Sequence, residues 1–177
     1  MTGRSRLPLV YLRPGELAIF EERARVTTVL GSCVSVTMYC RRTGAAAICH
    51  STLPECGREN MCAGYFCANA FRYVTCSLRF MLSTFEAAGV SPGELEVKLF
   101  GGADSIGSAN SVGKRNVSTA LKLLKAAGLA VSASDTGDSQ GRKIIFFPHT
   151  GEVLLKRLKG GAAVHGYSKR NVRGGTE

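Results

Sequence analysis

Residues 27–40 read TTVLGSCVSVTMYC, a pattern of two short strands separated by a break at Gly31-Ser32. Val26 to Leu30 is rich in β-branched residues, which favour strands. Side chains from Cys33 to Tyr39 then alternate, as they do in a strand with two different faces. One face would carry Val34, Val36 and Met38, and the other Cys33, Ser35 and Thr37.

The residues after this stretch complete a hairpin. Arg41 to Gly44 has the composition of a turn, and Ala45 to His50 is expected to return as an antiparallel strand. Further strands are expected at Glu16–Phe20, Leu95–Phe100, Ala130–Ser134, Lys143–Phe147 and Glu152–Lys156, with PHTG as a tight turn before the last.

Two segments show the spacing of an amphipathic helix. In the first, apolar residues recur from Val74 to Phe85 and a glycine, Gly89, ends the run. In the second, Val117, Leu121 and Leu124 share one face and Gly128 ends the helix. Together with the strands, these helices predict an α+β fold built on a mostly antiparallel or mixed sheet.

The length and composition are those of one ordinary globular domain. The chain has 177 residues, of which 45% are hydrophobic and 20% charged. Residues 1–160 are expected to form the domain, and residues 161–177 a basic, flexible tail. No apolar run approaches a membrane span and no signal peptide is evident, so a cytoplasmic location without membrane insertion is expected.

The net charge of +10 allows three kinds of partner: nucleic acid, an acidic membrane surface or an acidic protein. The basic residues are spread along the chain, with some concentration in KRLKGG and HGYSKRNVRGG near its end. A solvated basic face accounts for this distribution. The chain has no Trp and no aromatic RNA-binding motif, so nucleic-acid binding is not expected.

Seven cysteines raise the question of disulfides or metal. They are Cys33, Cys40, Cys49, Cys56, Cys62, Cys67 and Cys76. The odd number and the absence of a signal peptide argue against a secreted disulfide framework. A zinc site from Cys56, Cys62, Cys67 and a histidine is conceivable, but no CxxC pair supports it. Most of these cysteines are expected to be reduced thiols, and no cofactor is expected.

A glycine-rich stretch, GGADSIGSANSVGKRNV, begins at Gly101 and invites a nucleotide-binding interpretation. A Walker A loop requires GxxxxGK[ST]. Ser108 follows Gly107 where lysine is needed, and Arg115 follows Lys114 where Ser or Thr is needed. The stretch is therefore interpreted as a loop that shapes the backbone before a helix.

Cys33 is a candidate nucleophile because it directly follows the break at Gly31-Ser32. Glycine permits close approach of a substrate, and N–H groups near Gly31 to Cys33 could face a developing oxyanion. A thiol needs a base, and only His50 ends a strand expected beside Cys33. The hydroxyl of Thr27 could orient the imidazole. A packed core cysteine and a buried histidine explain the same residues, and the spacing does not decide between the two interpretations.

The motifs taken together resemble the CheD family, the chemoreceptor glutamine deamidases of bacterial and archaeal chemotaxis. The matching segments are TTVLGSCVSV, ICHSTLP, EVKLFGGA, VGKRNV and DTGDSQGRKIIF, in family order across residues 16–157. The resemblance implies an α+β fold in which a β-sheet sandwich is flanked by two main helices. It also implies a distant similarity to bacterial toxin deamidases.

The resemblance further implies a Cys-His-Thr triad, which falls on Cys33, His50 and Thr27 in this chain. Thr28 is the neighbouring threonine that the family pattern excludes. Gly31 and Ser32 would border the oxyanion and the approaching substrate. The chain departs from the family at Asp135-Thr136-Gly137-Asp138, where many members read D-x-G-G, and in the cysteine-rich segment from Glu55 to Cys67.

The implied activity is hydrolysis of specific receptor glutamines to glutamate through a thioester on the cysteine. The implied partners are chemoreceptor cytoplasmic helices and a CheC-type phosphatase, with the chain expected to be a monomer. The alternative is a non-catalytic adaptor that binds chemoreceptors or CheC. On triad logic alone, a cysteine protease or transferase also remains open, and the resemblance leaves undecided whether receptor methyl esters are hydrolysed.

Overall fold

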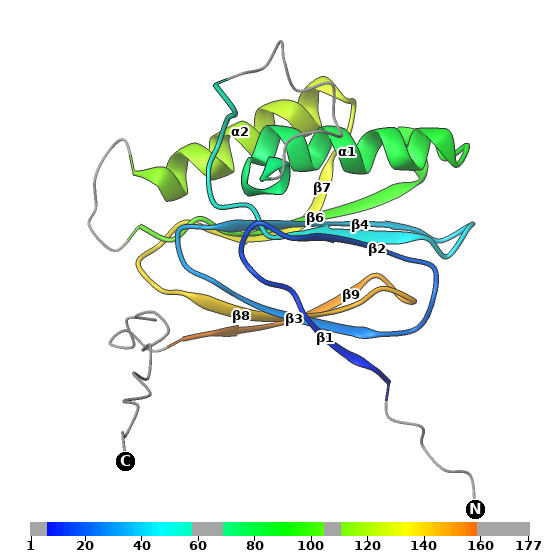
Figure 1. Cartoon of the computed structure of the whole chain (residues 1–177), viewed down its shortest axis with the longest axis horizontal. Helices are drawn as coiled ribbons and strands as arrows, with labels where there is room; N and C mark the ends of the chain where they lie inside the picture. The colour runs from blue at the N-terminus through cyan, green and yellow to red at the C-terminus, as the bar shows by residue number, and fades with distance from the viewer. Residues whose placement is uncertain (1–6, 58–68, 105–110, 159–177) are drawn as a thin grey trace, which may run out of the picture.

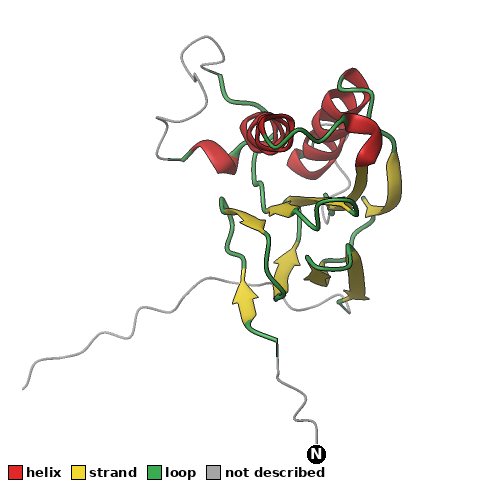
Figure 2. Ribbon diagram, turned by 90° about the vertical axis from the view of Figure 1, so that its right-hand side faces the viewer, coloured by secondary structure: helices red, strands yellow, loops and turns green. Residues whose placement is uncertain are grey.

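The computed structural model describes residues 7–57, 69–104 and 111–158, which form two stacked β-sheets and one layer of helices. Figure 1 shows both helices on one side of the upper sheet, with the second sheet on its other side. Figure 2, a view from the side, shows the same order of helices, sheet and sheet. The predicted α+β sandwich with two main helices is confirmed, and both helices cover the same face.

The first sheet has four strands in the order β1-β3-β8-β9. β1 pairs with β3 in parallel, and the β3–β8 and β8–β9 pairs are antiparallel. The strands are β1 (Leu9–Tyr11), β3 (Arg25–Leu30), β8 (Arg142–Phe147) and β9 (Glu152–Arg157).

The second sheet has five strands in the order β2-β5-β4-β6-β7. Its pairs are antiparallel except for the parallel pair of β6 and β7. The strands are β2 (Leu17–Phe20), β5 (Ala46–Cys49), β4 (Val34–Cys40), β6 (Leu95–Gly101) and β7 (Val131–Thr136). The expected hairpin is the β4–β5 pair, which occupies the centre of this sheet.

The helices are α1 (Val74–Ala87) and α2 (Val112–Ala126), and short 3-10 turns cover Ala70–Arg72 and Pro92–Glu94. The expected glycines follow both helices, and Gly89 and Gly128 have φ values of 69° and 72°. Such left-handed backbone favours glycine, which explains why each helix stops there. The strand that sequence patterning missed is β1, which has only three residues, two of them exposed.

Two hydrophobic layers follow from the alternation in the central strands. The helix-side layer includes Val34, Val36 and Met38 together with the apolar faces of α1 and α2. The layer between the sheets includes Val26, Leu30, Ile48 and Phe146, with Cys33 packed against its edge. The two faces predicted for residues 33–39 are therefore observed, and the odd-numbered face looks toward the other sheet.

Candidate active site

Cys33 lies where the chain passes from one sheet to the other. β3 belongs to the first sheet and β4 to the second, so the turn at Gly31–Cys33 joins the two layers. Backbone N–H groups after β6 hold this turn: Gly102 donates to the Cys33 carbonyl at 2.8 Å and Ala103 to the Gly31 carbonyl at 2.8 Å. The side chain of Cys33 is partly exposed and remains reachable from solvent.

Steric crowding explains why KLFGGA has glycines at this position. A Cβ atom on Gly101 would lie 2.2 Å from the Cys33 carbonyl oxygen, and the φ of Gly101 is +106°. Any other residue would push the turn away from the sheet. The expectation of a backbone-shaping segment is confirmed for Gly101 and Gly102, whereas residues 105–110 lie outside the described residues.

His50 shares a sheet face with Cys33. The β4–β5 register pairs Thr37 with Ile48, and a further bridge pairs Val34 with Ser51. The same register sets Ser35 opposite His50, and Cys33 is then the diagonal neighbour of His50 on that face. His50 is only 1% exposed, so its ring is buried between the sheets near the edge where Cys33 emerges.

A threonine hydroxyl orients the imidazole. Thr28 Oγ1 lies 2.7 Å from His50 Nδ1 and donates its own proton to the Leu12 carbonyl at 2.8 Å. A hydroxyl has one proton, and a carbonyl can only accept. His50 Nδ1 is therefore assigned the ring proton from this network, which leaves Nε2 as the basic nitrogen.

The contact with His50 comes from Thr28, whereas the sequence interpretation assigned it to Thr27. Thr27 Oγ1 donates instead to the Ile144 carbonyl at 3.0 Å on the neighbouring strand β8. The reason is the alternation of β3, since Thr28 shares the face of Val26 and Leu30 that points toward the second sheet. Thr27 has the opposite parity and faces away from His50.

Burial disfavours the charged forms of both the Cys33 thiol and the His50 imidazole. Burial lowers the pKa of His50 to about 4, opposed by the Leu12 carbonyl and the charge of Glu16. Burial also raises the pKa of the Cys33 thiol, opposed by its own backbone N–H. His50 Nε2 is buried and has no hydrogen-bond partner in the part of the chain that the structure describes. A neutral imidazole can accept a proton, so this pair is suited to general-base activation of the thiol.

The turn before Cys33 also offers main-chain donors. Among residues 7–57, 69–104 and 111–158, no carbonyl accepts a hydrogen bond from the backbone N–H of Ser32 or Cys33. These are the donors that the sequence interpretation assigned to an oxyanion. Among the described residues, nothing lies within 4 Å of the position that a Cβ on Gly31 would occupy, which leaves space beside the turn.

The side chain of Asn116 links this turn to the segment that follows β5. Its Nδ2 atom donates to the Ser32 carbonyl at 3.0 Å and to the Thr52 carbonyl at 3.1 Å. The side chain is 0% exposed, and its Oδ1 atom is buried with no hydrogen-bond partner among residues 7–57, 69–104 and 111–158. A residue of α2 thus ties the segment before Cys33 to the segment after His50.

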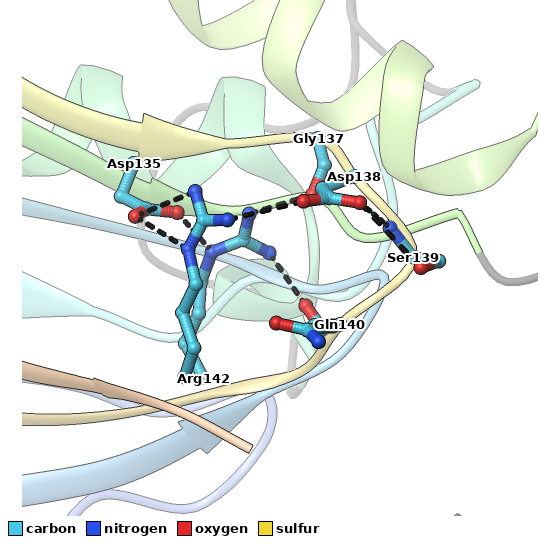
Figure 3. A network of polar contacts seen from close by, with 7 residues as sticks. Asp135, Gly137, Asp138, Ser139, Gln140 and Arg142 are labelled. Carbon is cyan, nitrogen blue, oxygen red and sulfur yellow. Dashed lines mark hydrogen bonds and ion pairs between the residues drawn. The ribbon is translucent and has the colours of Figure 1, made fainter. Parts of the chain in front are cut away.

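A hydrogen-bond network around the buried Arg142 side chain lies beside the same turn, where β8 pairs with the end of β3. Arg142, paired with Leu30 across β3 and β8, is 0% exposed. Figure 3 shows its guanidinium among Asp135, Gly137 and Gln140. It donates to Asp135 Oδ1 at 2.6 Å and to the Gly137 and Gln140 carbonyls at 2.6 and 3.0 Å. The segment that departs from the D-x-G-G pattern therefore links β7 of one sheet to β8 of the other.

The structure describes four cysteines besides Cys33. Cys40, Cys49, Cys56 and Cys76 are reduced, and Cys62 and Cys67 lie outside the described residues. In the described part of the chain, no three His, Cys, Asp or Glu side chains come together as a metal site. His149 lies in the turn after β8, and His165 is outside the described residues together with the basic tail. No helix within the described ranges is long and apolar enough to cross a membrane.

A thiol and a neutral imidazole on one sheet face, beside open main-chain donors, form the kind of site that thiol-dependent acyl-transfer enzymes use. The chain belongs to the CheD family. The family described as "CheD chemotactic sensory transduction" matches residues 56–157.

Named relatives extend this match over most of the chain. A protein of Geobacter sulfurreducens, "Probable chemoreceptor glutamine deamidase CheD 2", is 49% identical over 89% of this chain and 96% of its own length. "Probable chemoreceptor glutamine deamidase CheD" of Oleidesulfovibrio alaskensis is 38% identical over 88% of this chain and 76% of its own length. A protein of the same name in Pyrococcus abyssi is 35% identical over 85% of this chain and 92% of its own length.

Sequence reasoning excluded Thr28 and missed Asn116 and Arg142. The signal for Thr28 was present in RVTTVL, where Val26 and Leu30 already mark the inward face. Asn116 belongs to the VGKRNV segment, which supported the family resemblance but did not indicate this contact. Arg142 had no local signal, because its burial depends on strands from both sheets.

Proposed function

We propose that this chain is a protein-glutamine deamidase that converts chemoreceptor glutamines to glutamate. The observation that supports the chemistry is the contact between Thr28 and His50 Nδ1, which leaves Nε2 as the basic nitrogen of an imidazole that shares a sheet face with Cys33. The substrate class is carried over from the relatives, whose names specify chemoreceptor glutamine. Action in the cytoplasm, as a monomer, belongs to the same proposal.

In the proposed first step, His50 Nε2 takes the Cys33 proton while the sulfur attacks the carboxamide carbon of the glutamine. Neutral resting groups favour this coupled transfer over a stored thiolate–imidazolium pair. The N–H groups of Ser32 and Cys33 would stabilise the tetrahedral oxyanion. The protonated imidazole then gives its proton to the departing nitrogen, releasing ammonia and leaving a thioester on Cys33.

In the second step, His50 Nε2 deprotonates a water molecule that attacks the thioester carbon. The carbon–sulfur bond breaks, the thiol regains a proton, and glutamate is released. Thr28 would act as a positioning residue that holds the imidazole tautomer and ring orientation. Thr27, whose hydroxyl is bound to the Ile144 carbonyl, has no part in this mechanism.

The test uses a purified chemoreceptor cytoplasmic fragment incubated with the wild-type protein or with Cys33→Ala. Deamidation adds about one mass unit at each converted glutamine, because an amide NH₂ is replaced by OH. We expect the gain with the wild type only, measured by peptide mass spectrometry. Equal conversion by both proteins would rule out Cys33 as the nucleophile, and conversion by neither would favour the adaptor alternative.

A CheC-type phosphatase is proposed as a second partner. The support is family membership alone, and the measurement is co-purification of the two chains. Hydrolysis of receptor methyl esters by the same thiol can be followed in the same mass spectra as a loss of the methyl group.

A further inference from the structure

A groove of about 430 Å³ runs along α2, opposite the end of β7. Val117 and Leu121 supply its apolar surface, and Lys114, Lys122 and Lys125 stand along it. Lys114 and Lys125 are eleven residues apart, so the groove follows about three turns of the helix, roughly 16 Å. A second helix laid beside α2 matches a groove of this shape and length.

The groove is both apolar and positively charged. Leu121 is 45% exposed, which is high for a leucine on a packed helix. α2 carries four cations, Lys114, Arg115, Lys122 and Lys125, and no carboxylate. An occupant with an apolar strip bordered by acidic residues would cover Leu121 and pair with the lysines.

The lysines of this groove are only partly neutralised within the described chain. Lys114 Nζ lies 3.3 Å from Asp104 Oδ2. No carboxylate in the described ranges is within salt-bridge distance of Lys122 or Lys125. The carboxylates at the end of β7, Asp135 and Asp138, are already paired with Arg142 and Arg157.

The inner end of the groove, which is the end at Gly102 and Gly137, reaches the segment that carries Cys33. Gly102 lines the groove, and its N–H donates to the Cys33 carbonyl at 2.8 Å. Gly137 also lines it and donates to the Gly101 carbonyl at 3.0 Å. A helix in the groove would therefore end, or continue, beside the turn that carries Cys33.

We propose that this groove is the docking site for an acidic amphipathic helix of the protein substrate. The inference rests on the proposed deamidase function and specifies how the substrate is held. Val117 and Leu121 contact the apolar strip of the helix, and Lys122 and Lys125 pair with its carboxylates. Docking there brings a glutamine near the groove's inner end within reach of Cys33.

The test compares two double charge reversals. Lys122→Glu/Lys125→Glu alters the groove, and Lys143→Glu/Lys156→Glu alters two exposed lysines paired across β8 and β9 on the opposite sheet. Both variants change the net charge equally. We expect the groove variant to raise KM for the receptor fragment about tenfold with kcat nearly unchanged, and the control to change KM less than twofold.

Two further measurements separate docking from chemistry. Alkylation of Cys33 by iodoacetamide requires no docked helix, so its rate should be the same in the groove variant and the wild type. Titration calorimetry with Cys33→Ala proteins measures binding of the receptor fragment without turnover. There the groove substitutions should weaken Kd about tenfold, and this result stands even if the wild type converts no glutamine.

Four outcomes overturn the proposal. Equal weakening by both double variants would show that net charge alone attracts the receptor. Unchanged Kd in the groove variant would place the substrate elsewhere. Competition for the groove by duplex DNA, or self-association that the groove substitutions abolish, would identify a different occupant.

Discussion

Thr28 Oγ1 lies 2.7 Å from His50 Nδ1, and the same hydroxyl donates to the Leu12 carbonyl. This relationship assigns the imidazole tautomer, because the single hydroxyl proton is already used. It also joins the two sheets, since Thr28 is in β3 of the first and His50 directly follows β5 of the second.

Replacing Thr28 should affect catalysis, whereas replacing Thr27 should not. Thr28→Val keeps the side-chain shape but leaves Nδ1 without its partner, so kcat should fall about tenfold or more. Thr27→Val removes only the bond to the Ile144 carbonyl, at a cost of about 1 kcal/mol of stability. Steady-state deamidation kinetics of both variants check this, and a greater loss of kcat in Thr27→Val would refute the assignment.

The pH dependence of Cys33 alkylation should be that of an ordinary or weakly reactive thiol. Burial raises the pKa of the Cys33 thiol, and burial lowers the pKa of His50 to about 4. A neutral imidazole gives the thiolate no cationic partner, so the alkylation rate should keep rising into the alkaline range. The rate with iodoacetamide, followed by mass spectrometry from pH 5 to pH 10, measures this. A fast plateau between pH 5 and pH 8 would instead reveal a preformed ion pair.

Asn116 should matter for both stability and turnover. Asn116→Leu has a similar volume but leaves the Ser32 and Thr52 carbonyls without their shared donor. The free energy of unfolding should fall by about 2–4 kcal/mol. If the protein stays folded, kcat should fall while KM for the receptor fragment is nearly unchanged, because the turn before Cys33 is no longer fixed.

The control for Asn116 is Thr119→Val, one turn further along α2. Thr119 Oγ1 contacts Glu55 Oε1 at 3.4 Å, away from the Ser32 carbonyl. Urea unfolding gives the stability of each variant, and kinetics give kcat. An Asn116→Leu protein with wild-type kcat would show that the contact is only structural.

The arginine network should make the fold sensitive to acid. Although burial alone would raise it, the pKa of Asp135 is lowered by hydrogen bonds from Arg142 and Arg157. A carboxyl with a lowered folded-state pKa stabilises the fold above its unfolded pKa, and this stabilisation is lost as the pH falls through the folded value. Asp135→Asn should therefore unfold more readily at pH 7 and lose less stability than the wild type on acidification below pH 4.

The complementary substitution replaces the arginine that pairs with Asp135. Arg142→Met removes a fully buried cation and leaves Asp135 paired with Arg157 alone. The loss should stay below about 3–5 kcal/mol, the usual cost of removing one member of a buried pair, because Asp135 is 22% exposed and keeps Arg157. Thermal unfolding of the two single variants and the double variant measures the coupling. Additive losses would show that the pair does not act as a unit.

Much of this protein followed from local sequence. Alternation in residues 33–39 specified the two faces of β4, and apolar spacing with a terminal glycine specified both helices, because these signals depend on neighbours along the chain. The motifs around Cys33 and His50 also identified the family, and they supplied both residues of the proposed thiol–imidazole pair.

Only the tertiary structure decided which threonine meets the imidazole. Thr27 and Thr28 are adjacent and chemically identical, and a one-residue shift reverses the face of a strand. The crossing of the chain at Gly31–Cys33 and the burial of Arg142 depend on strands from both sheets. Asn116 reaches Ser32 across 84 positions of sequence, a contact that no local pattern encodes.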